Sequence, residues 1–165
     1  ARMQPLAVLP VTWQVLRGLR ALNLDMNQPW LQKAKRWLES VQRPDGGWGE
    51  RCNTYDDPVF KGQGPSTASQ TAWAVMGLCA FDDPDSPSLR CGIEYLIRTQ
   101  NADGSWSEEE ITGTGFPKVF YLKYDMYRNA WPLLALATYK KLQAQRPAAG
   151  AAMIHPLPEV VLSSP

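Results

Sequence analysis

A motif that ends in Asp-Gly-x-Trp occurs twice in the chain, and it constrains the fold more than any other feature. Residues 37–48 and 95–106 align with an offset of 58. Five identical pairs fall in register: Leu38/Leu96, Gln42/Gln100, Asp45/Asp103, Gly46/Gly104 and Trp48/Trp106. Each copy closes a run with apolar residues at helical spacing. The Asp-Gly pair predicts a turn with positive φ at the glycine, which ends the helix.

A second set of helices alternates with the first. Residues 12–22, 71–81 and 131–139 resemble one another, and the copy at 71–81 is apolar nearly all round, so it should be buried on every side. Self-similarity with a period near 58 predicts stacked helical hairpins, which form an open solenoid or part of a closed toroid. The fold class is therefore all-α. We expect helices near 11–23, 29–42, 67–81, 87–99 and 119–143.

The segment 113–127 combines a Gly/Pro loop with a series of aromatic residues. Phe116, Phe120, Tyr124 and Tyr127 follow one another at spacings of four, four and three. In a helix these four rings lie along one face. Such a face is either plain core or a wall that holds an apolar ligand or a cation.

The glutamine and tryptophan of each turn have a structural interpretation. Gln42 and Gln100 stand at helix C-termini, where they can bond backbone groups or lie flat on Trp48 and Trp106. Either arrangement ties one hairpin to its neighbour. Packing is favoured over carbohydrate binding because tryptophan at a fixed repeat position usually packs.

Composition excludes several kinds of function. A net charge of +1 with no basic run gives no reason to expect nucleic-acid binding. Three cysteines without a CxxC pair and one histidine, His155, provide no disulfide framework, zinc site or histidine-based triad. These cysteines fit a reducing compartment. No secretory leader and no apolar run of ~18 residues is visible, and Ala1 in place of methionine suggests a missing N-terminus.

Four smaller features are interpreted as structural, and for some of them a functional role is the alternative. Asp56 and Asp57 are expected in a solvated loop rather than as a catalytic pair, and the acidic run 108–110 is likewise expected in solvent. Trp73 is expected in the core, with a cavity-lining role as the alternative. Pro132 predicts a helix start or a kink near Trp131.

These residues together resemble a known family. The pattern Gln-x-x-Asp-Gly-x-Trp after an outer helix is similar to the QW motif of the triterpene cyclases. Residues 66–73 and 113–128 closely resemble the C-terminal part of squalene–hopene cyclase. The resemblance covers residues 12–142.

The resemblance implies an α/α toroid of alternating inner and outer helices and a cyclase that needs no cofactor and no metal. Such an enzyme protonates a terminal alkene of squalene and carries the cation through ring closures to hopene or hopanol. By residue-wise match, Phe116, Phe120, Tyr124 and Tyr127 stabilise late carbocations, and Leu122 shapes the cavity. The resemblance also implies a bacterial enzyme attached peripherally to the cytoplasmic side of the inner membrane.

The chain departs from the family pattern at two places. No Asp-x-Asp-Asp proton donor is present, and residues 8–11 stand where the family has a tyrosine-rich run. We therefore expect a divergent segment at 1–11, part of the cyclase domain at 12–145 and a flexible tail at 146–165. Besides squalene, the expected partner of this chain is the N-terminal part of the same enzyme. The fragment alone should be inactive.

Two other functions stay open at this point. One is a non-catalytic helical-repeat module that binds a lipid or a partner helix. The other is a prenyltransferase-type subunit on the same toroid, which would need zinc ligands that the sequence does not offer.

Overall fold

The structure is a computed structural model that describes residues 8–116 and 119–145. The expectations for residues 1–7, for His155 and for the tail 146–165 lie outside the described residues. The elements follow in the order α1 (Val8–Ala21), α2 (Pro29–Ser40), two 3₁₀ turns, η1 (Cys52–Tyr55) and η2 (Pro58–Phe60), α3 (Ala68–Cys79), α4 (Pro87–Arg98), β1 (Gly113–Phe116), β2 (Phe120–Leu122) and α5 (Tyr127–Ala144).

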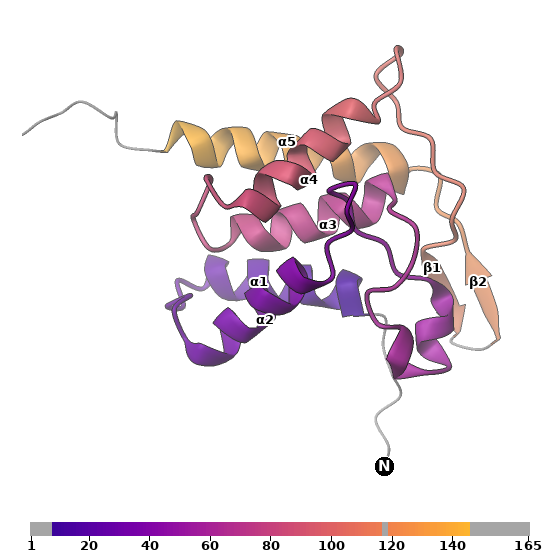
Figure 1. Cartoon of the computed structure of the whole chain (residues 1–165), viewed down its shortest axis with the longest axis horizontal. Helices are drawn as coiled ribbons and strands as arrows, with labels where there is room; N and C mark the ends of the chain where they lie inside the picture. The colour runs from indigo at the N-terminus through magenta and orange to yellow at the C-terminus, as the bar shows by residue number, and fades with distance from the viewer. Residues whose placement is uncertain (1–7, 117–118, 146–165) are drawn as a thin grey trace, which may run out of the picture.

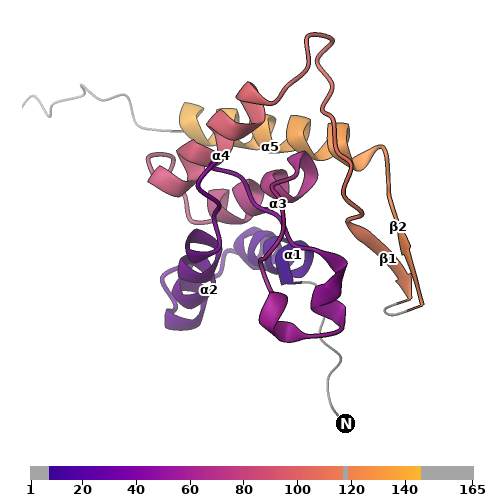
Figure 2. The ribbon, with the colours of Figure 1, turned by 45° about the vertical axis from the view of Figure 1, so that its right-hand side comes forward.

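Helices α1, α3 and α5 form an inner layer, with α3 in the middle (Figure 1). They run in the same direction, and their N-terminal ends lie on the side of the molecule that carries the β-hairpin (Figures 1 and 2). Helices α2 and α4 pack on this layer from outside and return in the opposite direction. The alternation of inner and outer helices predicted from the repeat is confirmed.

Helix α3 is the centre of the core. All twelve of its residues are buried, as its uniform apolar character predicts. Its first turn nevertheless carries Ser69, Gln70 and Thr71, which are buried as well. Thr67 caps the helix by accepting a hydrogen bond from the backbone N–H of Gln70 at 3.2 Å. Buried polar groups need partners. Those of this turn come from Thr67 and from Trp48, Glu50 and Glu108, which lie in or just after the turns at 42–48 and 100–106, called the QW turns below.

The outer helices are amphipathic. Leu31 and Leu38 of α2, and Leu89 and Leu96 of α4, are fully buried against the inner layer. Each helix begins with a proline, which has no backbone N–H to leave unpaired there. The glycine at the end of each following turn, Gly46 or Gly104, has a φ of +86°, as predicted from the Asp-Gly pair.

Four of the five predicted helices match the structure within a few residues. The fifth, expected over 119–143, is wrong in its first part because β2 (Phe120–Leu122) pairs antiparallel with β1 (Gly113–Phe116) and α5 begins only at Tyr127. Aromatic residues next to a Gly/Pro loop favour extended backbone, and the pairing with β1 satisfies that backbone. Pro132 lies inside α5, so the alternative that it starts the helix is also wrong.

The three cysteines, all within the described residues, are free thiols. Within the same residues, no group of His, Cys, Asp and Glu could hold a metal ion. Among the described helices, none is both long and apolar enough to cross a bilayer.

Candidate functional site: an aromatic wall at the ends of the inner helices

The hairpin carries the first part of the predicted site. Its register pairs Gly113 with Leu122 and Phe116 with Phe120, with an irregularity between Thr114 and Phe116. Because side chains alternate along a strand, Phe120 and Leu122 lie on one face of β2 and Tyr121 on the other. Gly113 has a packing role, since a Cβ there would lie 2.6 Å from the ring of Tyr124.

The predicted aromatic residues form two ring pairs rather than one helical stripe. Phe116 and Phe120 meet edge to face, with ring centroids 5.7 Å apart. Tyr124, in the loop after the hairpin, stacks on Tyr127 at the start of α5, with centroids 4.7 Å apart. We call these four residues together with Leu122 the aromatic wall.

Most of the aromatic wall is uncovered. Phe116 is 65% exposed, Phe120 43% and Tyr124 40%. Exposed large apolar side chains that gather on one surface mark a binding surface or an interface. The wall offers ring faces, aliphatic carbon and two phenol hydroxyls, but no carboxylate or amine. It can therefore stabilise a cation through ring quadrupoles without removing a proton from it.

Tyr127 connects the wall to the core. Its ring lies edge to face with Trp73 of α3, at 5.9 Å, and with Trp131 of α5, at 5.8 Å. Trp131 in turn contacts Trp73 and Trp13 of α1, at 6.4 and 5.2 Å. Trp73 is 3% exposed, so its predicted place in the core is confirmed.

The two QW turns have the same internal geometry. Trp48 Nε1 donates to the carbonyl of Leu38, and Trp106 Nε1 to that of Leu96, both at 2.8 Å. Gln42 Nε2 donates to the carbonyl of Gly46 at 2.8 Å, and Gln100 Nε2 to that of Gly104 at 2.9 Å. The glutamines thus bond backbone groups, the first of the two alternatives raised by the sequence.

Further repeat-related contacts were missed by the sequence reasoning. The backbone N–H of Trp48 donates to Thr71 Oγ1 and that of Trp106 to Asn129 Oδ1, two acceptors that are also 58 positions apart. Two residues after each tryptophan stands a buried glutamate. Glu50 accepts from the N–H of Leu9 in α1, and Glu108 from the N–H and hydroxyl of Ser69 in α3.

Glu108 corrects the expectation of a solvated acidic run. It is 6% exposed, and burial raises the pKa of its carboxyl, while the hydrogen bonds from Ser69 oppose that shift. The signal that would have found it is the repeat itself, because Glu50 and Glu108 share its offset. Carboxylates at these places offset the positive ends of helices α1 and α3.

Other titratable groups near the inner layer do not offer a nucleophile or an acid. Burial raises the pKa of Cys79 to about 12, with a smaller contribution from Asp82, so the thiol stays neutral. Asp56 and Asp57 are exposed, and Asp57 caps η2 by accepting from the N–H of Val59. Their expected place in a solvated loop is confirmed.

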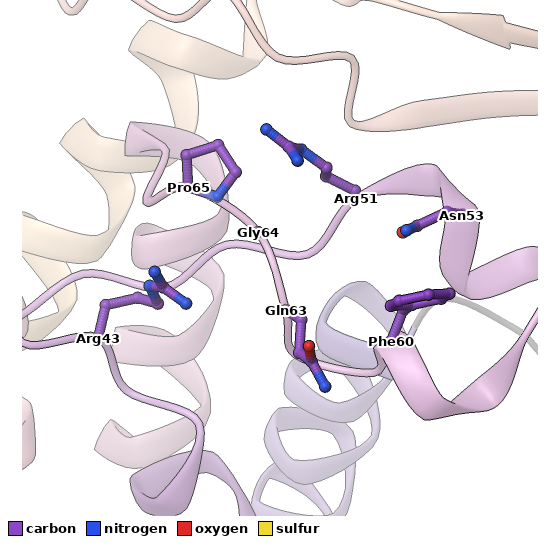
Figure 3. Close-up of a pocket in the computed structure, with 7 residues that line it drawn as sticks. All are labelled: Arg43, Arg51, Asn53, Phe60, Gln63, Gly64 and Pro65. Atoms are coloured by element: carbon purple, nitrogen blue, oxygen red, sulfur yellow. The ribbon is translucent and has the colours of Figure 1, made fainter.

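Two hollows have no residue of the aromatic wall in their lining. One, of about 440 Å³, is lined by Arg43, Arg51, Asn53, Phe60, Gln63, Gly64 and Pro65. Figure 3 shows Arg43 and Arg51 on opposite sides of the segment that contains Gly64. The other, of about 350 Å³, lies between Cys52, Ile111 and Tyr121. Arg51 borders both hollows and is 3.7 Å from Glu110, and charged hollows of this kind do not suit a hydrocarbon.

The alternating inner and outer helices and the two QW turns are those of a segment of an α/α toroid of the terpene cyclase class. Comparison with known sequences agrees with this class. The sequence model of the squalene-hopene cyclase C-terminal domain matches residues 7–141. The chain belongs to the squalene–hopene cyclase family.

Individual relatives show how much of an enzyme the chain represents. The squalene–hopene cyclase of Bradyrhizobium diazoefficiens is 48% identical over 134 residues, which are 80% of this chain and 20% of that enzyme. The dammaradiene synthase of Dryopteris crassirhizoma is 46% identical over 131 residues, 70% of this chain and 19% of that protein. The squalene–hopene cyclase of Alicyclobacillus acidocaldarius is 51% identical over 98 residues, 59% of this chain and 16% of that enzyme. The chain thus spans about a fifth of the length of these relatives.

Proposed function

We propose that this chain is the C-terminal part of a cyclase that converts squalene to hopene or hopanol, and that the aromatic wall lines the end of the cavity where late carbocations form. The observation that carries the proposal is the wall itself: four rings and a leucine, most of them exposed, on the β-hairpin, in the loop after it and at the first residue of α5. Names of relatives support the substrate class, since several are squalene–hopene cyclases.

The chemistry of the wall fits a reaction that proceeds through cations. A protonated terminal alkene closes rings in sequence, and the last cation either loses a proton to give hopene or takes up water to give hopanol. A base beside an intermediate cation would end the sequence early. A ring face contributes about 0.5–2 kcal/mol of stabilisation and accepts no proton. Phe116, Phe120, Tyr124 and Tyr127 supply such faces in this proposal, and Leu122 supplies shape.

The acid that starts the reaction belongs, in this proposal, to another part of the same enzyme. The sequence contains no Asp-x-Asp-Asp motif, and Asp56 and Asp57 lie in solvent. The chain alone should therefore form no cyclised product. The reaction needs no organic cofactor, because a proton enters at the first step and, in hopene formation, leaves at the last.

A chimera tests the proposal directly. Residues 7–141 would replace the matched segment of the Bradyrhizobium diazoefficiens enzyme, and products from squalene would be analysed by gas chromatography. We expect cyclised triterpene from the chimera, and none from the enzyme with the segment deleted or from this chain alone. A folded chimera without product would refute the proposal. Product from the chain alone would refute the assignment of the acid elsewhere.

We also propose that the complete enzyme works on a membrane surface. Squalene is a hydrocarbon and dissolves in the bilayer rather than in water, so an enzyme that takes it up gains from an apolar contact with the membrane. The full-length chimera should float with phospholipid vesicles in a density gradient at moderate salt. Recovery in the vesicle-free fraction would contradict this part of the proposal.

A further inference from the structure

The five tryptophans in helices α1, α3 and α5 and in the two QW turns fall into two groups. Trp48 and Trp106 are buried and donate their indole N–H to carbonyl oxygens. Trp13, Trp73 and Trp131 also bury the indole nitrogen, but within the described residues that nitrogen has no hydrogen-bond partner. A buried donor without an acceptor is costly and calls for an explanation.

The second group comes from three different inner helices and meets in one cluster. Trp13 lies in α1, Trp73 in α3 and Trp131 in α5, and Trp131 contacts the other two edge to face. Leucine fills core space without an N–H to satisfy. The ring shape and quadrupole of the indoles are therefore the properties that these positions use.

The cluster ends at the aromatic wall. Trp73 and Trp131 contact the ring of Tyr127 at interplanar angles of 77° and 71°, so two edges hold one ring. Tyr127 stacks on Tyr124 at an angle of 26°. Tyr124 lies outside any helix or strand and is 40% exposed. Its ring lies close to Gly113 of β1 and stacks on Tyr127. Its orientation therefore depends in part on Tyr127, and the orientation of Tyr127 depends on the two indoles.

We propose that Trp73 and Trp131 are positioning residues of the cyclase: they hold Tyr127 by edge-to-face contacts, and through it they hold Tyr124 toward the late carbocation. The inference rests on the proposed function. The proposed role does not extend to Trp13, because in the described part of the chain Trp13 forms a ring pair with Trp131 and with neither tyrosine.

The matched variants are Trp73→Leu, Trp131→Leu and Trp13→Leu, with Trp73→Phe as the conservative replacement. All three leucine variants remove a largely buried indole and lower stability, so thermal unfolding would be recorded for each. In the chimera, we expect Trp73→Leu and Trp131→Leu to raise the ratio of incompletely cyclised to complete products about tenfold, because misplaced groups lose rate steeply. KM for squalene should stay within about twofold, since the wall acts on the cation rather than on the bound alkene.

Trp13→Leu should lose stability without changing the product ratio, and Trp73→Phe should restore most of the parent ratio. If Trp13→Leu shifts the ratio as much as Trp73→Leu, the indoles have only a packing role and the proposal is wrong. It is equally wrong if Trp73→Leu and Trp131→Leu leave the ratio unchanged.

A second measurement separates this proposal from the proposed function. In this chain labelled on tyrosine, the ring-proton NMR shifts of Tyr124 and Tyr127 report neighbouring ring currents without any turnover. Trp73→Leu should move both sets of signals and Trp13→Leu should move neither. An inactive parent chimera would refute the proposed function, whereas unchanged tyrosine signals in Trp73→Leu would refute the positioning role of the indoles.

Discussion

The two QW turns are built alike but are held differently by the rest of the molecule. In both, the indole N–H bonds a carbonyl ten residues earlier and the glutamine bonds the glycine carbonyl four residues later. In both, the N–H of that glycine donates back across the turn at 2.9 Å. This inner set of bonds lies within one segment of sequence, so each copy of the motif forms it independently.

The first turn has an outer set of bonds as well. Gln42 Nε2 donates a second bond to the carbonyl of Ser88 in α4, at 2.9 Å. Asp45 accepts from the hydroxyl of Ser66, and its backbone carbonyl accepts from Arg98. These bonds join the hairpin α1–α2 to the hairpin α3–α4.

The second turn has fewer bonds of this kind within the described residues. Gln100 is exposed, and its side-chain bond within the described residues goes to Gly104 alone. Asp103 accepts from Ser105 within its own turn. The motif thus has two separable functions: both copies close a turn, and the first copy also joins two hairpins through Gln42 and Asp45.

The largest expected effect comes from removing the indoles. Trp48→Ala and Trp106→Ala should each lower the free energy of unfolding by about 3–5 kcal/mol, measured by urea denaturation. The loss should be greater at Trp48, because its ring lies so close to Gly92 of α4 that a Cβ there would come within 2.8 Å of it, and a site packed this tightly cannot collapse. Equal losses, or a greater loss for Trp106→Ala, would contradict the view that Trp48 occupies the more tightly packed site.

Alanine substitutions at Gly46 and Gly104 distinguish the cost of backbone strain from the cost of steric crowding. Gly46 and Gly104 share a φ of +86°, so alanine is strained at both by about 1–2 kcal/mol. A Cβ at Gly46 would also lie 2.7 Å from the carbonyl oxygen of Cys91, whereas the nearest atom at Gly104 is 3.9 Å away. Gly46→Ala should therefore cost about 1–3 kcal/mol more than Gly104→Ala in the same denaturation assay. A cost at Gly104 as large as that at Gly46 would mean that strain alone decides.

The contrast between the turns also explains what sequence reasoning could reach. The motif and its offset are local patterns, so the helices, the turns and the positive φ of both glycines could be predicted from the residues alone. The buried helix α3 was predictable for the same reason, because its residues are apolar all round.

The hairpin was not predictable by that route, and Glu108 was missed although it shares the repeat offset with Glu50. Spacings of four, four and three suit a helical face, but Phe120, Leu122 and Tyr124 also alternate as in a strand, and only the pairing with β1 decides. Glu108 stands in an acidic run that is solvated in most proteins, and its burial depends on the distant N–H of Ser69. For the same reason the sequence suggested one stripe of rings, whereas the structure has two pairs.

Substitutions at Gln42 and Gln100 test the hydrogen bonds that join the two helical hairpins. Gln42→Ala removes two bonds, one of them to the next hairpin, and should cost about 1–2 kcal/mol. Gln100→Ala removes one exposed bond and should cost about 0.5 kcal/mol or less. Gln42→Glu is the matched control, because it keeps the length of the side chain and places a charged acceptor against two carbonyl oxygens. It should be at least as destabilising as Gln42→Ala, and a neutral outcome would show that the donor is not needed.

The smallest expected effect is a pH dependence that arises from the second turn. Burial raises the pKa of Glu108, so the folded state holds its proton to a higher pH than the unfolded state, where a glutamate titrates near ~4.3. Between that value and the raised pKa the folded state binds more protons, and stability falls as pH rises, with a slope of at most about 1.4 kcal/mol per pH unit. The contribution of this carboxyl is complete below the unfolded pKa and is lost above the folded one.

Glu108→Gln keeps an acceptor for the N–H of Ser69 and should flatten this part of the profile, whereas Glu109→Gln, at an exposed position, should preserve the slope that Glu108 produces. If the curves for Glu108→Gln and the parent run parallel, the carboxyl is not protonated on folding, and the first and second turns would differ only in their bonds to neighbouring hairpins.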